Sequence, residues 1–411
     1  MLIYMIFSQS RFPSIFSKLT FFYVTYSLIV FCSPNSGTDG SGLAAFALRS
    51  SDNTFYSNSF SLIGPDNNGN NDLTVAPYFE SGLYTVASLQ DDSKFPQKVI
   101  LNNISIKDKN GNLIETVSSF NGVLLRDLIN IGGKFKPLDK GKDGRATVVV
   151  LEGKDGYKAI VSYTELMRTS LGAEMIVAYE KNGGLLDSDS GSMAFVSKGD
   201  TNQGTRYVKF LTKITVINEW LTQSGTGTTA SFSVTGDVIT PLNYSISDLQ
   251  NTSNFASINF SAIGPISNSK HYILGKGVSL LEVLSKSTLR SPNDFQSYYV
   301  ILEATDKYRV THSYAELSNT IIGSGSGSLP SPGVIVITEF KKGLGGNYYT
   351  PPASLTDYTS CSGTGNVCDT DYIATISSED TAPYGGDVTA GINLGPRKMS
   401  WLNTIILKKA E

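Results

Sequence analysis

The chain has 411 residues, of which 40% are hydrophobic and 17% charged, and its formal net charge is -3. This length allows two domains, and the 39 glycines favour strands and turns over long helices. The weak net charge and the lack of a basic run exclude a nucleic-acid partner. They also exclude attachment to an acidic membrane surface by charge alone.

Residues 1–31 form a segment of their own, which we interpret as a secretory signal peptide. Arg11 and Lys18 are its only charges, and an uncharged, mainly apolar run over 19–31 follows them. A basic start followed by a short apolar run is typical of a secretory signal. The run is too short for an ordinary membrane span, which needs about 20 residues.

Cys32 directly follows this run and predicts a lipid anchor. Residues 28–31 followed by cysteine resemble a bacterial lipobox, although the position before the cysteine carries the large Phe31 instead of a small residue. The alternatives are an ordinary cleaved signal and a retained anchor. Residues 32–56 are rich in Ser, Gly, Asp and Asn and predict a flexible tether. We therefore expect an extracytoplasmic, membrane-anchored lipoprotein, at the cell surface or in the periplasm.

The remainder of the chain resembles itself. Five segments of the first half recur in the same order in the second half, which indicates a tandem repeat. The paired segments are 84–95 with 244–255, 122–129 with 277–284, 155–166 with 306–317, 175–180 with 334–339, and 206–211 with 397–402. The spacing widens before the last pair, which predicts an insertion at 347–382. The expected domains are 57–220 and 232–411, joined by a flexible linker at 221–231.

Within each copy the expected elements follow one order. Short helical turns begin at Ser88 and Asp248, and a strand ending at Gly122 or Gly277 precedes a short amphipathic helix. Residues 147–151 and 299–302 then predict buried strands, each followed by a hairpin turn. Ser162 begins the next helix as its N-cap, with Glu165 three residues later in a capping box. Many strands with a few short helices predict an α+β fold, duplicated in tandem.

Two features of the insertion predict a binding surface held by a disulfide. Cys361 and Cys368 lie in one short loop outside the reducing cytosol, so we expect a disulfide, worth on the order of 2 kcal/mol for so small a loop. Tyrosines gather in the same segment, and exposed tyrosines with Gly, Ser and Asn recur in binding surfaces. A loop packed on its own domain by these rings is the alternative. The tyrosines are Tyr348, Tyr349, Tyr358, Tyr372 and Tyr384.

Taken in order, these segments resemble the molybdopterin-binding oxidoreductase domain family, which has the fold of the sulfite oxidase catalytic domain. The likeness covers roughly 60–220 and again 232–408. Each motif is weakly specific alone, and their order carries the resemblance. The matching motifs are the opening strand 232–241, the helix start 244–249, the helix 122–128, the turn Asp155-Gly156-Tyr157, the strand end 178–183 and the closing strand 206–211.

The chain departs from this family at the residues that would hold the cofactor. The resemblance implies a cysteine that ligates molybdenum shortly after the first helix, yet neither 95–103 nor 255–262 contains cysteine. Residues 191–195 also lack the arginine that the family places there to bind the pterin phosphate. We therefore expect no cofactor, with molybdopterin as the alternative. A residual ligand cleft would involve Asn102, Arg206, Lys209 and Ser261.

The sequence offers little else for catalysis. It has only two histidines, and His312 is expected to be packed or at the surface, where Val161 stands in the first copy. Because no cluster of metal ligands occurs, we expect no metal site. The main hypothesis is a non-catalytic lipoprotein that binds a protein or a small ligand. The alternatives are an extracytoplasmic molybdopterin-dependent oxidoreductase and a structural envelope protein.

Overall fold

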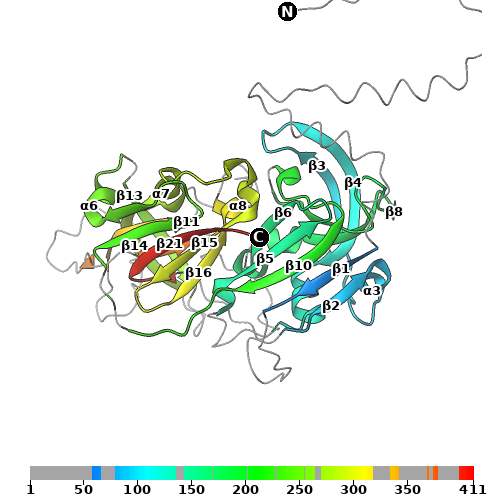
Figure 1. Cartoon of the computed structure of the whole chain (residues 1–411), viewed down its shortest axis with the longest axis horizontal. Helices are drawn as coiled ribbons and strands as arrows, with labels where there is room; N and C mark the ends of the chain where they lie inside the picture. Colours follow the sequence, from blue (N-terminus) through cyan, green and yellow to red (C-terminus); the bar gives the residue numbers. More distant parts are fainter. Residues whose placement is uncertain are drawn as a thin grey trace, which may run out of the picture. The chain divides into compact units, whose positions relative to one another are not determined.

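A computed structural model describes residues 58–65, 79–135, 143–168, 170–200, 202–225, 227, 229–253, 255–263, 270–317, 334–341, 368–369, 374–377 and 398–411. These residues fold into four sheets and a few short helices (Figure 1). The expected α+β class is therefore confirmed. The signal peptide, Cys32, the tether, Cys361 and the five tyrosines of the insertion lie outside the described residues.

The first half contains two sheets. The first has the order β2-β1-β10-β5-β6, and the second has the order β3-β4-β7-β8 with β9 also paired to β7. The strands of the first sheet are β1 (Ser59–Ile63), β2 (Gly82–Thr85), β5 (Thr147–Gly153), β6 (Lys158–Ser162) and β10 (Leu211–Asn218). Those of the second are β3 (Val99–Lys107), β4 (Leu113–Leu124), β7 (Met175–Lys181), β8 (Gly184–Leu185) and β9 (Ala194–Ser197).

The second half repeats this strand order. Its sheets run β12-β11-β21-β15-β16 and β13-β14-β17-β19-β20, with β18 also paired to β17. The strands of the first are β11 (Ser231–Gly236), β12 (Leu242–Ser245), β15 (Tyr298–Ala304), β16 (Arg309–Ser313) and β21 (Leu402–Lys409). Those of the second are β13 (Ala256–Ile263), β14 (Lys270–Ser279), β17 (Val334–Lys341), β18 (Cys368–Asp369), β19 (Ala374–Ser377) and β20 (Lys398–Met399).

The two halves agree in detail as well as in order. β1 pairs in parallel with β10, and β11 pairs in parallel with β21. The register shift in β4 next to Gly122 recurs in β14 next to Gly277. A side chain at Gly122 would meet the Val177 carbonyl oxygen at 2.3 Å, which explains the glycine. The proposed duplication of one ancestral unit stays a prediction. It would require the two halves to agree in strand order and in register shifts, as they do.

The short helices lie in the predicted segments. They are α3 (Val86–Gln90), α4 (Leu125–Asp127), α5 (Tyr163–Arg168), α6 (Ile246–Gln250), α7 (Leu280–Ser285) and α8 (Tyr314–Leu317). Of these, α3 and α6 begin at Val86 and Ile246, two residues before the predicted starts at Ser88 and Asp248. Thr85 and Ser245 cap α3 and α6 with full capping boxes. Single turns η4 (Asp143–Ala146), η5 (Ser170–Glu174), η6 (Gln203–Thr205) and η7 (Pro292–Ser297) join other elements, and a π-helical turn η2 (Leu128–Gly132) extends α4.

The predicted insertion 347–382 contributes two strands to the second half. β18 and β19 pair with β17, and β19 occupies the place in its sheet that β9 occupies in the first half. The additional residues of the second half therefore lie on both sides of these two strands. Cys368 belongs to β18, and its disulfide with Cys361 stays a prediction.

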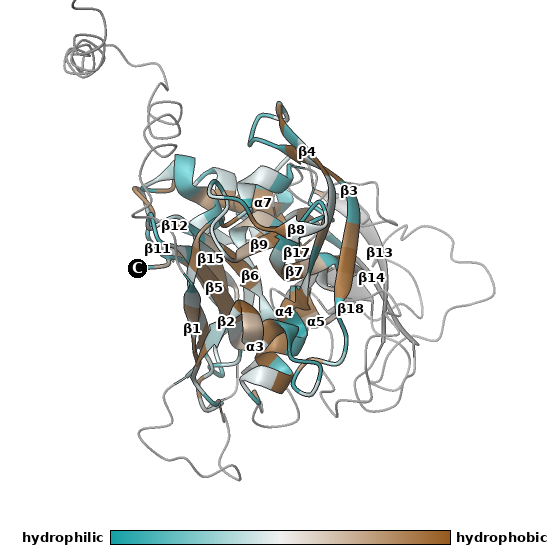
Figure 2. Ribbon diagram, turned by 90° about the vertical axis from the view of Figure 1, so that its right-hand side faces the viewer, coloured by the Kyte–Doolittle hydropathy of each residue, from teal (hydrophilic) through white to brown (hydrophobic). Residues whose placement is uncertain are grey.

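Strand β5 explains how the halves meet. Nearly all its side chains are buried, because Val149 and Leu151 face the core of the first half while Val148 and Val150 pack in a separate apolar cluster. That cluster includes Tyr299 and Ile301 of β15. Figure 2 shows the apolar colouring of β5 and β15. Burial of each large aliphatic side chain contributes about 1.5–3 kcal/mol, so the halves share a stabilising contact.

Candidate functional site

The structure does not place the four predicted cleft residues in one environment. Asn102 is exposed on β3, and Ser261 lies on β13, where its side chain is outside the described residues. Arg206 is fully buried, and Lys209 is half-buried. Only Arg206 and Lys209 share a segment, the stretch that leads from η6 into β10. They are therefore the two residues with which a site can be built.

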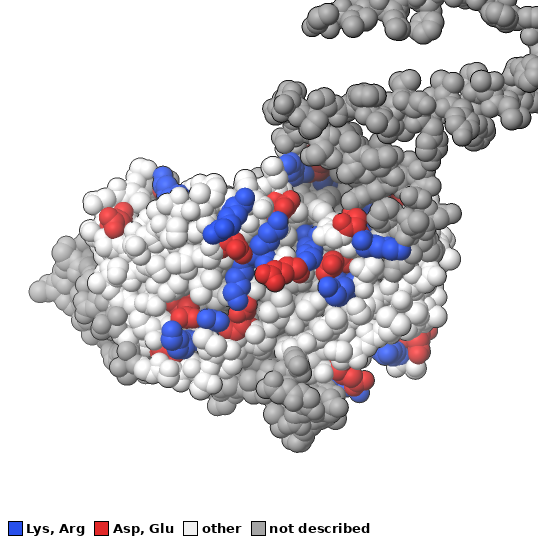
Figure 3. All heavy atoms as spheres, in the orientation of Figure 1, with Lys and Arg blue, Asp and Glu red and all other residues white. Residues whose placement is uncertain are grey.

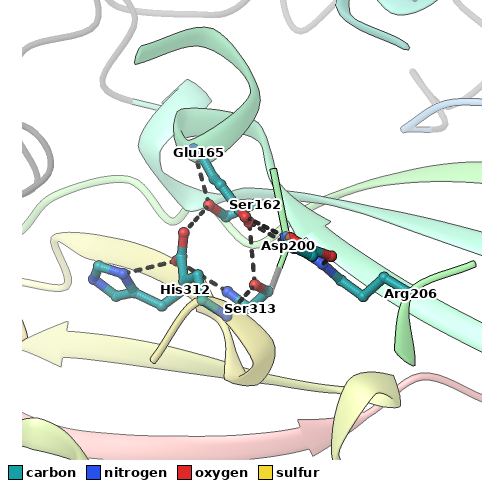
Figure 4. A network of polar contacts seen from close by, with 7 residues as sticks. Ser162, Glu165, Asp200, Arg206, His312 and Ser313 are labelled. Atoms are coloured by element: carbon teal, nitrogen blue, oxygen red, sulfur yellow. Dashed lines mark hydrogen bonds and ion pairs between the residues drawn. The ribbon is translucent and has the colours of Figure 1, made fainter. Parts of the chain in front are cut away.

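Arg206 is held between two buried carboxylates (Figure 4). Its Nε donates to Asp200 Oδ2 at 2.8 Å, and its Nη1 donates to Glu165 Oε2 at 3.1 Å. Nη2 lies 2.8 Å from Glu165 Oε1 and also contacts Asp200 Oδ1. All three side chains have 0% exposure. Every nitrogen of the guanidinium is thus engaged by this protein's own acids.

The electrostatics of this triad favour an ionised arginine. Burial acts to lower the pKa of Arg206, but the Asp200 and Glu165 carboxylates outweigh it and hold the pKa well above the usual value. Burial raises the pKa of Asp200 above its usual value, although the nearby Arg206 acts in the opposite direction. A charge without a partner would be very costly at this depth. The triad therefore depends on all its members.

The same network joins the two halves through a pair of exchanged hydrogen bonds. Ser162 Oγ accepts from the Glu165 N–H at 3.0 Å, and Ser313 Oγ accepts from the Glu316 N–H at 3.0 Å, as two equivalent helix caps. Each serine then donates across to the other half. Ser162 Oγ donates to Glu316 Oε2 at 3.1 Å, and Ser313 Oγ donates to Glu165 Oε2 at 3.2 Å.

Each glutamate also has partners within its own half. Glu165 contacts Arg206, whereas Glu316 lies 2.9 Å from Nδ1 of His312 and accepts from the Ser313 N–H. His312 is fully buried, so the expectation of a packed histidine is confirmed. The predicted capping box at Ser162 is half-formed, because the Glu165 carboxylate is directed to Arg206 and Ser313. Since the network is closed to solvent, it positions the halves and offers no access to a substrate.

Lys209 lies in a second polar cluster, formed with the ends of β4 and β7. Its ammonium sits 5.5 Å from the ring centroid of Tyr207, whose hydroxyl is 3.1 Å from Ser190 Oγ. Burial lowers the pKa of Lys209, although nearby carboxylates oppose the shift, and burial raises the pKa of Tyr207 to about 12. The neighbouring Lys181 contacts Glu115 at 2.5 Å and Asp187 at 3.0 Å.

The described residues contain no group of three or more His, Cys, Asp or Glu side chains that could hold a metal ion. In the same part of the chain, no helix is both long enough and apolar enough to cross a membrane. On the face seen in Figure 3, acidic and basic side chains are interspersed.

Comparisons with known proteins bear on the family. Residues 109–225 match the model of the oxidoreductase molybdopterin binding domain, so the resemblance inferred from the sequence is confirmed for this part of the chain. No curated protein matches the chain. Among solved structures, the chain is similar to the sulfane dehydrogenase SoxCD of Paracoccus pantotrophus, with 10% identity and a TM-score of 0.29. That likeness covers 80% of this chain and 77% of the other.

Several members of the buried network escaped the sequence analysis. Ser162 and Glu165 were recognised only as a helix cap, and Asp200, Ser313 and Glu316 were not singled out. The matched Ser-x-x-Glu boxes of the two repeats were the available signal. Their crossing between the halves is a tertiary feature that no local pattern records.

Proposed function

We propose that this chain, in which residues 109–225 match the molybdopterin binding domain of oxidoreductases, is a non-catalytic binding protein that keeps the fold of that domain. The observation that carries the proposal is the state of Arg206. A cofactor with a phosphate needs several fixed cationic or N–H donors. The guanidinium of Arg206 is instead fully buried and forms ion pairs with Glu165 and Asp200, so each of its nitrogens is already engaged.

The other described groups fit the cofactor equally poorly. Glu115 and Asp187 lie among the charges that act on Lys209, and both also pair with Lys181, so carboxylates surround the remaining cation of this segment. Two lysines and two carboxylates leave no net positive charge here to attract a phosphate. The strands β3 and β13 carry no cysteine, so they provide no thiolate for a metal. The described residues therefore do not fit a molybdopterin cofactor.

The family match itself favours a second candidate, a molybdopterin-dependent oxidoreductase. The match bears on this candidate more directly than on a binding role, because the domain is named for the cofactor that it binds. Both candidates share the fold and differ in one measurable quantity, the molybdopterin content. A structural envelope protein would lack both the cofactor and a specific ligand.

Metal and pterin analysis separates the candidates. The full chain is produced in a bacterial host that makes molybdopterin, with molybdate supplied, beside a molybdopterin oxidoreductase as a positive control. We expect molybdenum, tungsten and the fluorescent oxidation products of the pterin to stay far below one equivalent per chain. Stoichiometric metal with pterin would overturn the binding proposal and establish the oxidoreductase.

The proposed location is testable through Cys32. A lipid on this residue would anchor the protein to a membrane outside the cytosol. With an alkyne-bearing fatty acid fed to the producing bacterium, we expect labelled protein in the membrane fraction. The Cys32→Ser variant should lose the label and leave that fraction, while Cys368→Ser should keep both. Label retained by Cys32→Ser would contradict the anchor.

A further inference from the structure

A pocket of about 540 Å³ opens where the two halves of the described chain meet. It lies between the turn that follows β5, the turn η7, the residue after β11 and the end of β21. Its volume is in the range of small-molecule sites. Its polar lining includes Lys158, Asp237, Asp294, Gln296 and Lys409.

The side-chain amide of Gln296 is the first group in the pocket that could bind a ligand. Its residue is only 7% exposed, and it lines the pocket. Among the described residues its side-chain amide makes no hydrogen bond. An amide carries two N–H donors and one carbonyl acceptor, which are available to a molecule in the pocket. A bound molecule with both an acceptor and a donor would satisfy it.

Lys158 supplies a cation that is incompletely paired. Its side chain is 16% exposed, and its ammonium lies 4.0 Å from Glu152 Oε2, beyond hydrogen-bonding distance. The same carboxylate oxygen lies 2.7 Å from the ammonium of Lys213. Because Glu152 is already engaged by Lys213, the ammonium of Lys158 keeps donors for an anion in the pocket.

Asp237 supplies the opposite charge. One of its carboxylate oxygens accepts the backbone N–H of Lys409 at 2.8 Å, and Asp237 forms no ion pair within the described residues. The ammonium of Lys409 is directed elsewhere, to Asp294 at 2.8 Å. Glu411 also lines the pocket and is exposed. Besides the ion pair of Lys409 with Asp294, the pocket therefore has one cation, Lys158, and two acidic groups, Asp237 and Glu411.

We propose that this pocket binds a small zwitterion of the free amino acid class. The carboxylate of the ligand would contact Lys158 and the N–H groups of Gln296, and its ammonium would contact Asp237. A zwitterion offers an anion to Lys158 and a cation to the acidic groups, whereas an uncharged sugar pairs with neither and a dicarboxylate pairs with Lys158 alone. The inference rests on the proposed binding role and names the ligand class for it.

Titration calorimetry on the purified full chain tests the proposal with a panel of free L-amino acids. Succinate and glucose serve as probes of the two competing classes. We expect saturable binding of at least one amino acid and none of its N-acetyl or methyl ester form. Gln296→Leu and Lys158→Met should each weaken that binding by about tenfold or more, since each removes a hydrogen bond to a charged group.

Matched controls separate binding from folding. Gln250→Leu and Lys286→Met change the same residue types at exposed positions that do not line the pocket, and both should bind as the unaltered chain does. All four variants are checked for an unchanged unfolding transition. The proposal is overturned when no amino acid binds, when Gln296→Leu binds normally, or when succinate or glucose binds instead. None of these outcomes alters the molybdenum content, so the two proposals fail separately.

Discussion

Replacing Arg206 by methionine is expected to lower the free energy of unfolding by about 3–5 kcal/mol, one of the two largest effects we anticipate for a single residue of this chain. The substitution keeps the apolar volume but leaves Glu165 and Asp200 buried, both fully inaccessible, with no cation beside them. Carboxylates in that position must either ionise without compensation or take up protons. Urea unfolding followed by circular dichroism measures the loss.

Two comparisons show whether the charge is the cause. Arg126 is partly exposed beside Asp127, so Arg126→Met should change stability by less than about 0.5 kcal/mol. Combining Arg206→Met with Glu165→Gln and Asp200→Asn removes the uncompensated charges, so it should recover much of the lost stability. A triple variant no more stable than Arg206→Met would show that packing, and not charge, explains the effect.

Replacing Glu316 by alanine is expected to destabilise the chain by about 2–4 kcal/mol. The carboxylate of Glu316 accepts from the Ser313 N–H, contacts His312 and accepts from Ser162 of the other half. Alanine leaves these buried groups without their acceptor. Glu316→Gln keeps one carbonyl oxygen and should cost distinctly less. The measurement is the midpoint of urea unfolding at constant slope.

The contribution of the hydrogen bond between the halves can be separated from the total destabilisation expected for Glu316→Ala. A double-mutant cycle between Ser162→Ala and Glu316→Gln should give a coupling of about 0.5–1.5 kcal/mol, because the two groups touch directly. Ser245→Ala replaces an exposed cap of α6 in place of Ser162 and should show no coupling to Glu316→Gln. Additive behaviour of the first pair would mean that the crossed hydrogen bond contributes nothing to stability.

Much of the fold was predictable because the sequence records each unit twice. Strands, hairpins and helix starts depend on local patterns, and a pattern that recurs at equivalent positions is hard to misread. Thus β5 and β15 follow from their apolar runs, and α3 and α6 were placed within two residues of their starts. The strands β18 and β19 inside the predicted insertion were missed, because a spacing argument locates additional residues only approximately.

The candidate sites were harder to predict for a physical reason. From the sequence, Arg206 resembles an exposed cation at the end of a strand. Only the folded chain brings Glu165 of another segment into contact with it. The pocket around Gln296 is likewise assembled from residues whose only relation is spatial. Burial and pairing decide what a charged side chain can do, and neither is a property of its neighbours in sequence.

The crossed hydrogen bonds between Ser162 and Glu316 and between Ser313 and Glu165 have the symmetry of a homodimer. In a two-fold assembly of identical chains, every contact occurs twice with the roles of the partners exchanged. Once two such units are fused into one chain, each side can change without altering the other. Residues beside the crossed pair can therefore differ between the halves: the buried His312 contacts Glu316, whereas Val161 stands at the equivalent position of the first half.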